Sequence, residues 1–279
     1  MTMLKTDSNV AEAPDYGLDA PGVVRNLFLV AGVGLLLWGQ RALGFWSGLL
    51  VIPLAGYQLV FPLLAIGLAA GAVCGVLGVW MIYESKVGKL RRRERLLNHV
   101  LWTGHEQVLD VGCGRGLMLV GAAKRLSNGK ATGIDIWQAE DLANNHAEAA
   151  LENARRERVA DRVDVKTADM RRMPFADETF DVVVSRAAVH NLYQTAERAQ
   201  AVGEIARVLK PGGTVLIDDI RHHQEYVAAL SQKGCTEFRR LDAPFISWFL
   251  AVLTMGSLQP ATLLARKPQS VRLPKPEVN

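Results

Sequence analysis

A glycine-rich segment that follows an apolar run is the first feature able to do chemistry. The run 107–111 ends at Val111, and the segment Gly112–Gly116 then places a glycine at every second position before another apolar stretch. Glycines let the backbone approach a ligand closely and adopt unusual dihedral angles, so this loop suits a nucleotide-like ligand. A dinucleotide fingerprint would need a glycine where Leu117 stands. The spacing therefore disfavours a nicotinamide cofactor.

Two carboxylates follow later apolar runs. Asp135 lies near the end of the run 131–136, and Asp169 follows the run 162–168. Taken singly, each carboxylate fits the role of a helix cap or a turn residue at least as well as that of a ligand contact.

The elements that must position these residues alternate along the chain. Strands are predicted at 107–111, 131–136, 162–168, 180–185, 213–219, 235–241 and 260–266. Helices are predicted at 115–126, 139–157, 195–208 and 222–232. This alternation is typical of a doubly wound α/β fold, in which helices cover both faces of a mostly parallel sheet and ligands bind at the carboxyl ends of the strands. We therefore expect a seven-stranded Rossmann-like sheet.

Together these segments resemble the class I S-adenosylmethionine-dependent methyltransferases, in particular the group similar to ubiquinone and menaquinone biosynthesis methyltransferases. Asp110–Gly116 resembles the first motif of that family, and Gly133–Trp137 follows in the expected order. Pro174–Ser185 resembles the family's run into the fourth strand, and Leu209–Gly213 resembles its turn before the fifth. The resemblance covers residues 98–267.

The resemblance implies methyl transfer with S-adenosyl-L-methionine as the cofactor. It implies that Asp135 binds the ribose and that Asp169, with the backbone of Met170, binds the adenine. The implied cofactor site contains Asp110, Gly112, Cys113, Gly114, Gly116, Asp135, Ile136, Asp169, Met170 and Ser185.

The acceptor is expected to bind among residues that follow the fourth and fifth strands. These candidates are Ser185, Arg186, His190, Asn191, Asp218, Asp219, His222 and His223. His190 stands where related methyltransferases often carry a histidine-rich segment, and we predict it as the catalytic residue, a base or a substrate contact; an architectural role is the alternative. The Asn/Asp-Pro-Pro-aromatic motif of many nucleic-acid and protein methyltransferases is missing after the fourth strand, which disfavours those substrates.

An apolar block precedes the sheet elements. The 42 residues of Ala42–Tyr83 carry no charge, and neither do the 15 residues of Asn26–Gln40. Since about 20 apolar residues cross a bilayer as a helix, the block predicts a transmembrane hairpin with spans at 23–43 and 59–83. The glycines at 67, 71, 75 and 78 fall on one helix face, which is typical of helix packing in membranes. Three spans, or a buried hairpin of a soluble domain, are the alternatives.

A basic cluster follows the apolar block. It contains Lys86, Lys89, Arg91, Arg92, Arg93 and Arg95 against Glu84 and Glu94. Positive residues at the end of a span mark the cytoplasmic side and attract anionic lipid. We therefore expect everything after the cluster to be cytoplasmic.

Composition excludes other classes of protein. Of the 279 residues 49% are hydrophobic and the mean hydropathy is +0.11, which excludes a disordered chain. The basic excess is local, which argues against a nucleic-acid partner. The three cysteines are widely spaced and the six histidines lack the spacing of a helical zinc site, so no metal is expected.

These observations predict five regions. They are a tail at 1–22, a transmembrane hairpin at 23–83, a basic juxtamembrane helix at 84–104, a methyltransferase domain at 105–267 and a disordered tail at 268–279. A further apolar stretch, 244–258, is too short to span a bilayer, and it is expected to dip into the membrane interface or to form a buried connection.

The predicted function is methyl transfer at the cytoplasmic membrane surface. The acceptor would be small or lipophilic, such as a quinone precursor, a prenylated phenol, a lipid or a hydrophobic thiol. A membrane-bound module that binds S-adenosylmethionine without catalysis is the alternative.

Overall fold

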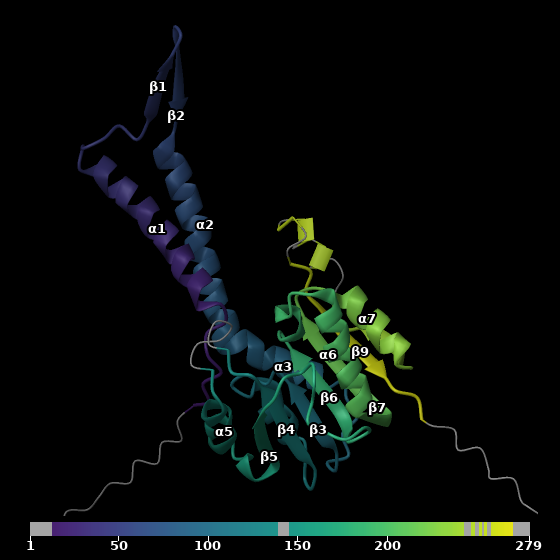
Figure 1. Cartoon of the computed structure of the whole chain (residues 1–279). Coiled ribbons are helices and arrows are strands. Elements are labelled where there is room, and N and C mark those ends of the chain that lie inside the picture. The colour runs from purple at the N-terminus through teal and green to yellow at the C-terminus, as the bar shows by residue number, and fades with distance from the viewer. Residues whose placement is uncertain are drawn as a thin grey trace, which may run out of the picture. The chain divides into compact units, whose positions relative to one another are not determined.

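The computed structural model describes residues 13–138, 145–242, 247–248, 251–252, 254–255 and 258–269, which form two compact units. The hairpin unit contains Gly17–Arg91. The sheet unit contains Arg92–Gln138 and the described residues from 145 onward, together with the segment that ends at Tyr16. Figure 1 labels most of the helices and strands of both units.

Some expectations lie outside the described residues. They concern the first twelve residues of the tail, the start of the expected helix 139–157, most of the apolar stretch 244–258 and the disordered tail from residue 270.

Seven strands form the sheet of the sheet unit, in the order β5-β4-β3-β6-β7-β9-β8. They are β3 (Gln107–Val111), β4 (Lys130–Asp135), β5 (Val163–Thr167), β6 (Phe180–Arg186), β7 (Leu209–Asp219), β8 (Thr236–Arg240) and β9 (Ala261–Arg266). The first five run parallel, and β9 is antiparallel to both of its neighbours. The expected seven-stranded Rossmann-like sheet is confirmed.

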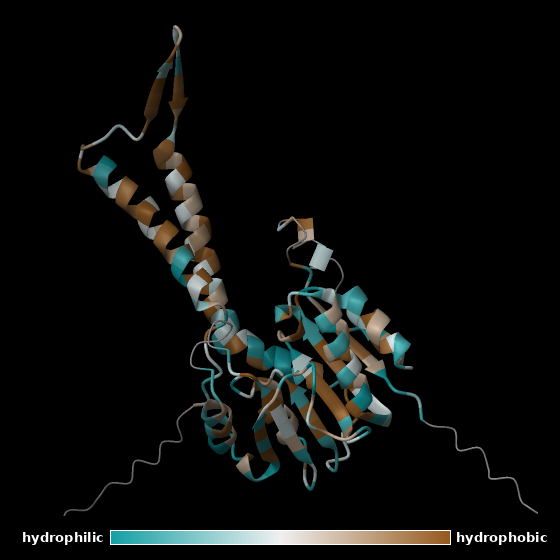
Figure 2. Cartoon of the chain, in the orientation of Figure 1, coloured by the Kyte–Doolittle hydropathy of each residue, from teal (hydrophilic) through white to brown (hydrophobic). Residues whose placement is uncertain are grey.

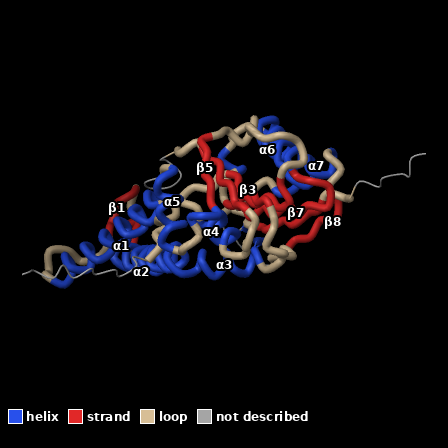
Figure 3. Tube along the Cα trace, turned by 90° about the horizontal axis from the view of Figure 1, so that it is seen from below, coloured by secondary structure: helices blue, strands red, loops and turns tan. Residues whose placement is uncertain are grey.

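Helices cover both faces of this sheet (Figure 3). Helices α4 (Leu117–Ala123) and α5 (Ala147–Arg156) lie on one face, and α6 (Thr195–Val208) and α7 (His223–Gln232) lie on the other. The short helices η2 (Ala160–Arg162) and η3 (Val189–Asn191) precede β5 and α6. Strand β3 lies inside the sheet between β4 and β6, and four of its five residues are buried. A continuous apolar core of this kind fixes the strand ends, where the candidate site residues stand.

The Leu209–Gly213 segment differs in detail from the expected turn. It belongs to β7, but its pairing with β6 is interrupted between Leu209, opposite Phe180, and Thr214, opposite Val182. Gly212 has a φ of 80°, which favours glycine. The Pro-Gly-Gly sequence therefore forms a bulge at the start of the strand.

Two long helices and a strand pair make up most of the hairpin unit. Helix α1 (Pro21–Ala42) and helix α2 (Leu63–Tyr83) are joined through the antiparallel strands β1 (Leu50–Leu54) and β2 (Tyr57–Phe61). The chain continues through the π-helical turn η1 (Glu84–Gly88) into α3 (Lys89–Leu97). The expected start of the second span at residue 59 is wrong, because residues 59–61 belong to β2.

Helices α1 and α2 are long and apolar enough to cross a membrane, and their apolar windows are only 11% buried. Figure 2 shows hydrophobic residues along both helices and both strands. All ten residues of β1 and β2 are exposed. Composition alone does not separate such helices from the core helices of a soluble protein, but core helices are mostly buried.

Glycines form the contact between α1 and α2. A Cβ atom on Gly34 would lie 2.5 Å from the carbonyl oxygen of Gly67, and one on Gly78 would lie 2.9 Å from the Phe28 ring. The structure thus places the glycine face of α2 against α1, where small residues let the backbones approach closely.

Polar contacts tie the two ends of the hairpin unit together. Lys89 is 3% exposed, and its Nζ donates to the carbonyl oxygen of Gly17 at 2.6 Å and to Asp19 Oδ1 at 3.1 Å. The amide of Asp19 donates to Ser85 Oγ at 3.1 Å. Part of the expected basic cluster is therefore internal, whereas Lys86, Arg91 and Arg95 are exposed.

The glycine contact predicts a stability difference within α1. Gly34→Ala should lower the melting temperature of the detergent-solubilised protein relative to Gly32→Ala, because overpacking costs about 1–3 kcal/mol. Gly32 is the matched control, since a Cβ atom there meets nothing within 4 Å. Equal melting temperatures for the two variants would contradict the packing described here.

Candidate functional site

The carboxyl ends of five parallel strands meet at one edge of the sheet. Asp110, Asp135, Ser185 and Asp219 lie in or at the ends of β3, β4, β6 and β7, and Asp169 follows β5. Ligands of open α/β sheets bind outside this edge, where the strand order reverses. The structure therefore brings the predicted carboxylates to one edge of the sheet.

The glycine loop after β3 needs its glycines. Gly112, Gly114 and Gly116 have φ values of 71°, 50° and 82°, which side-chain-bearing residues rarely adopt. A Cβ atom on Gly112 would lie 2.3 Å from the Cβ of Ala188. The amide of Gly112 donates to the carbonyl oxygen of Ile134 at 2.9 Å, which ties the loop to β4.

Asp110 is a buried carboxylate with one oxygen hydrogen-bonded within the protein. It is 1% exposed, and Oδ2 accepts a hydrogen bond from the amide of Leu119 at 2.7 Å. Among the described residues, Oδ1 has no hydrogen-bond partner. Burial raises the pKa of Asp110 to about 7, an effect that the Leu119 amide opposes and the nearby Asp135 carboxylate reinforces. The site therefore contains a buried acceptor that a ligand donor can satisfy.

Asp135 joins the glycine loop to the loop after β4. Its Oδ2 accepts from the amide of Gly114 at 2.8 Å, and its Oδ1 accepts from the amide of Trp137 at 2.7 Å. Asn145 Nδ2 also donates to Oδ1, at 3.4 Å. Because a carboxylate oxygen can accept two hydrogen bonds, Oδ2 can also accept from a ligand hydroxyl, and Oδ1 can do so in place of the long Asn145 bond. Ile136, the next residue, is 47% exposed at the rim.

Asp169 is paired within the protein. Its carboxylate accepts from the amide of Arg171 at 2.8 Å and forms an ion pair with the Arg171 guanidinium at 2.6 Å. These bonds hold the pKa of Asp169 below its usual value, and Arg171 also pairs with Glu197. Met170 lies beside the glycine loop, because its Cε is 3.6 Å from the position of a Cβ on Gly112. An adenine contact by Asp169 stays a prediction, and it would have to coexist with the Arg171 pair.

Two of the predicted cofactor residues have side chains that are buried within the protein. Ser185 is 1% exposed, and its hydroxyl donates to the carbonyl oxygen of Val111 at 2.8 Å. Cys113 is 5% exposed, and burial raises the pKa of its thiol well above the ordinary value. The geometry supports a structural role for both side chains.

His190 and Asp219 form a pair on the acceptor side. His190 Nδ1 lies 2.5 Å from Asp219 Oδ1, and the His190 amide donates to Asp219 Oδ2 at 3.1 Å. The hydroxyl of Tyr226 also donates to Asp219 Oδ2, at 3.1 Å. Asp219 is buried, whereas the His190 side chain is 17% exposed. The sequence predicted both members of this pair but missed Tyr226, which nothing in the sequence connects with Asp219.

A second polar cluster surrounds Asp218. Arg92 of α3 donates to both oxygens of its carboxylate, at 2.6 and 2.9 Å, and Arg186 lies 3.3 Å from Oδ2. Thr262 Oγ1 donates to Oδ1 at 2.8 Å. Burial alone would raise the pKa of Asp218, but Arg92 and Arg186 hold it below the usual value. The sequence missed Arg92 and Thr262 because they come from outside the strands that carry the motifs.

The remaining predicted acceptor residues, His222, His223 and Asn191, make contacts within the protein. His222 Nδ1 lies 3.0 Å from Glu225 Oε1, and His223 Nε2 lies 2.9 Å from the carbonyl oxygen of Gln259. Burial lowers the pKa of His223. Asn191 ends η3, and its amide donates to the carbonyl oxygen of Ala188.

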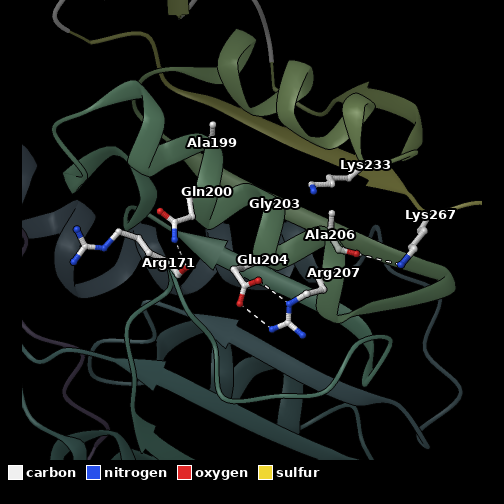
Figure 4. Close-up of a pocket in the computed structure, with 9 residues that line it drawn as sticks. All are labelled: Arg171, Ala199, Gln200, Gly203, Glu204, Ala206, Arg207, Lys233 and Lys267. Carbon is white, nitrogen blue, oxygen red and sulfur yellow. Dashed lines mark hydrogen bonds and ion pairs between the residues drawn. The ribbon is translucent and has the colours of Figure 1, made fainter.

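A cavity of about 450 Å³ lies elsewhere, along α6 (Figure 4). Its lining is Arg171, Ala199, Gln200, Gly203, Glu204, Ala206, Arg207, Lys233 and Lys267. Arg207 pairs with Glu204, and Lys267 donates to the carbonyl oxygen of Ala206. The cavity contains none of the predicted site residues, so it is not the candidate site.

Comparison with known proteins agrees with this fold. Residues 109–217 match the family model described as a methyltransferase domain. A methyltransferase of Streptomyces halstedii is 34% identical over 130 residues, 47% of this chain and 43% of the relative. A sterol 4-C-methyltransferase of Caenorhabditis elegans is 35% identical over 118 residues, 42% of this chain and 32% of the relative. A demethylmenaquinone methyltransferase of Symbiobacterium thermophilum is 30% identical over 168 residues, which are 58% of this chain and 60% of the relative. The chain thus spans about half the length, or less, of most curated relatives it matches.

Solved structures share the sheet. The [4+2]-cyclase SpnF superimposes with a TM-score of 0.51 at 21% identity, covering 65% of this chain and 82% of its own. A geranyl diphosphate C-methyltransferase from Streptomyces coelicolor A3(2) also has a TM-score of 0.51, at 19% identity. The match covers 63% of this chain and 78% of that methyltransferase. At these identities the likeness establishes the fold alone.

The buried Asp110 predicts a pH dependence of stability. Its pKa of about 7, against an ordinary value of 3.8, means that the folded protein binds the proton more tightly than the unfolded chain. Stability should therefore fall as the pH rises from about 4 to about 7. Asp110→Asn removes this contribution, so its melting temperature should rise relative to the unliganded wild type over that range. The expected difference is on the order of 4 kcal/mol, from about 1.4 kcal/mol for each tenfold change in proton affinity. Parallel pH profiles for the two proteins would rule out a raised pKa.

Proposed function

Because residues 109–217 match the model of a methyltransferase domain family, we propose that this chain transfers a methyl group from S-adenosyl-L-methionine. The observation that carries the proposal is the buried Asp110 beside the glycine loop. Its Oδ1 has no partner among the described residues, and the close approach of Gly112 to Ala188 leaves no room for a side chain. A buried acceptor of this kind needs a donor, and a ligand ammonium or hydroxyl group supplies one.

The residues at the strand ends fit the cofactor. The Asp135 oxygens would accept the ribose hydroxyls, and the exposed Ile136 and half-buried Met170 offer apolar surfaces for the adenine ring. Bound S-adenosylmethionine supplies an electrophilic methyl group on a sulfonium. The chain's part is then to hold the acceptor in line with that methyl group and to exclude water.

His190 would act as the base for a protonated acceptor. Asp219 Oδ1 lies 2.5 Å from Nδ1, close enough for an ion pair, although Nδ1 has no aligned hydrogen-bond partner among the described residues. Nε2 would then be the nitrogen that takes the proton of the acceptor. The Tyr226 hydroxyl and the His190 amide both donate to Asp219 Oδ2 and hold this carboxylate beside the ring. This arrangement suits an acceptor hydroxyl or an acidic carbon, because both must lose a proton during methylation.

The acceptor is proposed to be lipophilic. Two of the relatives are named as methyltransferases of a sterol and of demethylmenaquinone, both apolar molecules. The apolar surface of the hairpin unit supports a membrane location, where such acceptors are concentrated. A quinone precursor, a prenylated phenol, a lipid or a hydrophobic thiol fits this description.

The hairpin unit is proposed to cross the membrane twice. Tyr16 precedes α1 and Arg93 follows α2, yet their side chains are hydrogen-bonded at 3.1 Å within the sheet unit. Both ends of the hairpin must therefore lie on one side of the bilayer, which requires an even number of crossings. The exposed Arg91 and Arg95 favour the cytoplasmic side for the sheet unit.

A second candidate function is binding of the cofactor without methyl transfer. A [4+2]-cyclase shares this fold, so the fold alone does not require methyl transfer. One fold often hosts several activities, so only the site separates the two candidates.

Methyl transfer can be tested on the detergent-solubilised chain. We expect methyl-labelled S-adenosylmethionine and a membrane lipid extract to give label in the lipid fraction. Cofactor binding without transfer to any lipid, aqueous, volatile or protein fraction would favour the second candidate.

The cofactor site predicts a loss of affinity in one variant. Asp135→Ala should weaken cofactor binding by about 2–4 kcal/mol in calorimetry, since hydrogen bonds to a carboxylate are worth about 1.5–3 kcal/mol each. Unchanged affinity would remove Asp135 from the site.

The His190–Asp219 pair predicts a kinetic effect. His190→Ala should lower kcat by about 10²–10⁴ with little change in cofactor affinity, because general base catalysis is worth that much. His223→Ala is the matched control, since that ring bonds to the Gln259 backbone. If both variants keep wild-type kcat, His190 is architectural.

A further inference from the structure

The segment Ala13–Tyr16, here called the N-terminal strap, packs into the sheet unit although it precedes α1. Tyr16 is 5% exposed. Its hydroxyl donates to Glu157 Oε1 at 2.5 Å and accepts from Arg93 Nη1 at 3.1 Å. Burial raises the pKa of Tyr16, so the hydroxyl stays protonated, while hydrogen bonds from Lys124, Tyr16 and Arg93 overcome burial and lower the pKa of Glu157 to about 2. The strap is therefore a built part of this unit.

Asn153 of α5 joins the strap to the glycine loop. It is 1% exposed, and its Nδ2 donates to two carbonyl oxygens, those of Asp15 and Arg115, each at 2.9 Å. Its Oδ1 accepts from the amide of Asp15 at 2.8 Å. A buried amide that misses such partners costs free energy, so Asn153 holds both backbones in place.

An ion pair makes the same connection directly. Arg115 is the residue between Gly114 and Gly116, and its Nη2 lies 2.7 Å from Asp15 Oδ2. The Arg115 side chain is 12% exposed and that of Asp15 is 45% exposed. The strap is therefore linked to Arg115 twice, directly through the Arg115 side chain and through Asn153 to the Arg115 carbonyl oxygen.

We propose that the N-terminal strap positions the cofactor loop, with Asp15, Arg115 and Asn153 as positioning residues. The inference rests on the proposed function, since it assumes that Gly112–Gly116 binds the cofactor. Glycine-rich loops have many accessible conformations, and fixing one of them before binding removes an entropic cost of binding. The strap supplies this restraint at Arg115, between the second and third glycines of the loop.

The consequence concerns the chain's architecture. Helix α1 begins at Pro21, a few residues after the strap, so the segment that enters the hairpin unit is the one that holds the loop. Cofactor affinity therefore depends on residues that precede the hairpin and lie outside the family match, which begins at residue 109.

The test is a double-mutant cycle on cofactor affinity in the full-length, detergent-solubilised protein. Asp15→Ala and Arg115→Ala should each weaken binding of S-adenosylmethionine about tenfold, and the double variant should be no weaker than either single variant. The charge-reversed pair Asp15→Arg with Arg115→Asp should recover part of the affinity. KM for the cofactor should rise while kcat at saturating cofactor is kept. Arg155→Ala on α5, whose guanidinium pairs with Glu148 and Glu152, is the control and should bind normally.

The outcomes separate this inference from the proposed function. Wild-type affinity in both single variants, or fully additive losses in the double variant, overturns the strap's role while leaving the methyltransferase proposal intact. A wild-type protein that binds no S-adenosylmethionine overturns the proposed function itself. A fall in melting temperature without a change in KM would show that the strap only stabilises the fold, and would also overturn the inference.

Discussion

The hydrogen bond between the buried Asp110 carboxylate and the amide of Leu119 is the interaction on which the site depends. It fixes the end of β3 to the first turn of α4, so the loop between them must turn within Gly112–Gly116. That turn passes so close to Ala188 that only glycine fits at Gly112. The same carboxylate leaves a second oxygen for a ligand, and Asp135 stands at the end of the adjacent strand. One buried carboxyl group thus shapes the loop and leaves an oxygen for a bound donor.

Contacts between residues far apart in the sequence complete the sheet edge that carries the candidate site. Arg92, which follows the hairpin unit, binds Asp218, and the next residue, Asp219, holds His190. The strap, which precedes the hairpin unit, binds Arg115 in the cofactor loop. The two chain segments that flank the hairpin therefore each reach a different half of the proposed site within the sheet unit. Both flanking segments are thus bonded to the sheet edge that carries the proposed site.

The sequence predicted the sheet and the loop because their signals are local. Short apolar runs separated by helical patterns gave all seven strands, and the alternation of glycine in Gly112–Gly116 is a pattern of adjacent residues. The strands β1 and β2 were missed because an uninterrupted apolar run has neither the period of a strand nor that of a helix. The strap was missed because Asp15 and Asn153 are 138 residues apart, and the Arg92 contact with Asp218 spans 126 residues. Nothing in the sequence pairs such residues, since the sheet topology alone brings them together.

Hydrogen exchange with and without S-adenosylhomocysteine tests the central claim most directly, because it reports where the ligand binds. The account predicts slower exchange in the peptides that cover Gly112–Leu119 and Asp135–Gln138, with no change along α6 at Arg207 or at Lys267. Slower exchange along α6 and no change in the glycine loop would place the ligand in the cavity instead and contradict the site described here.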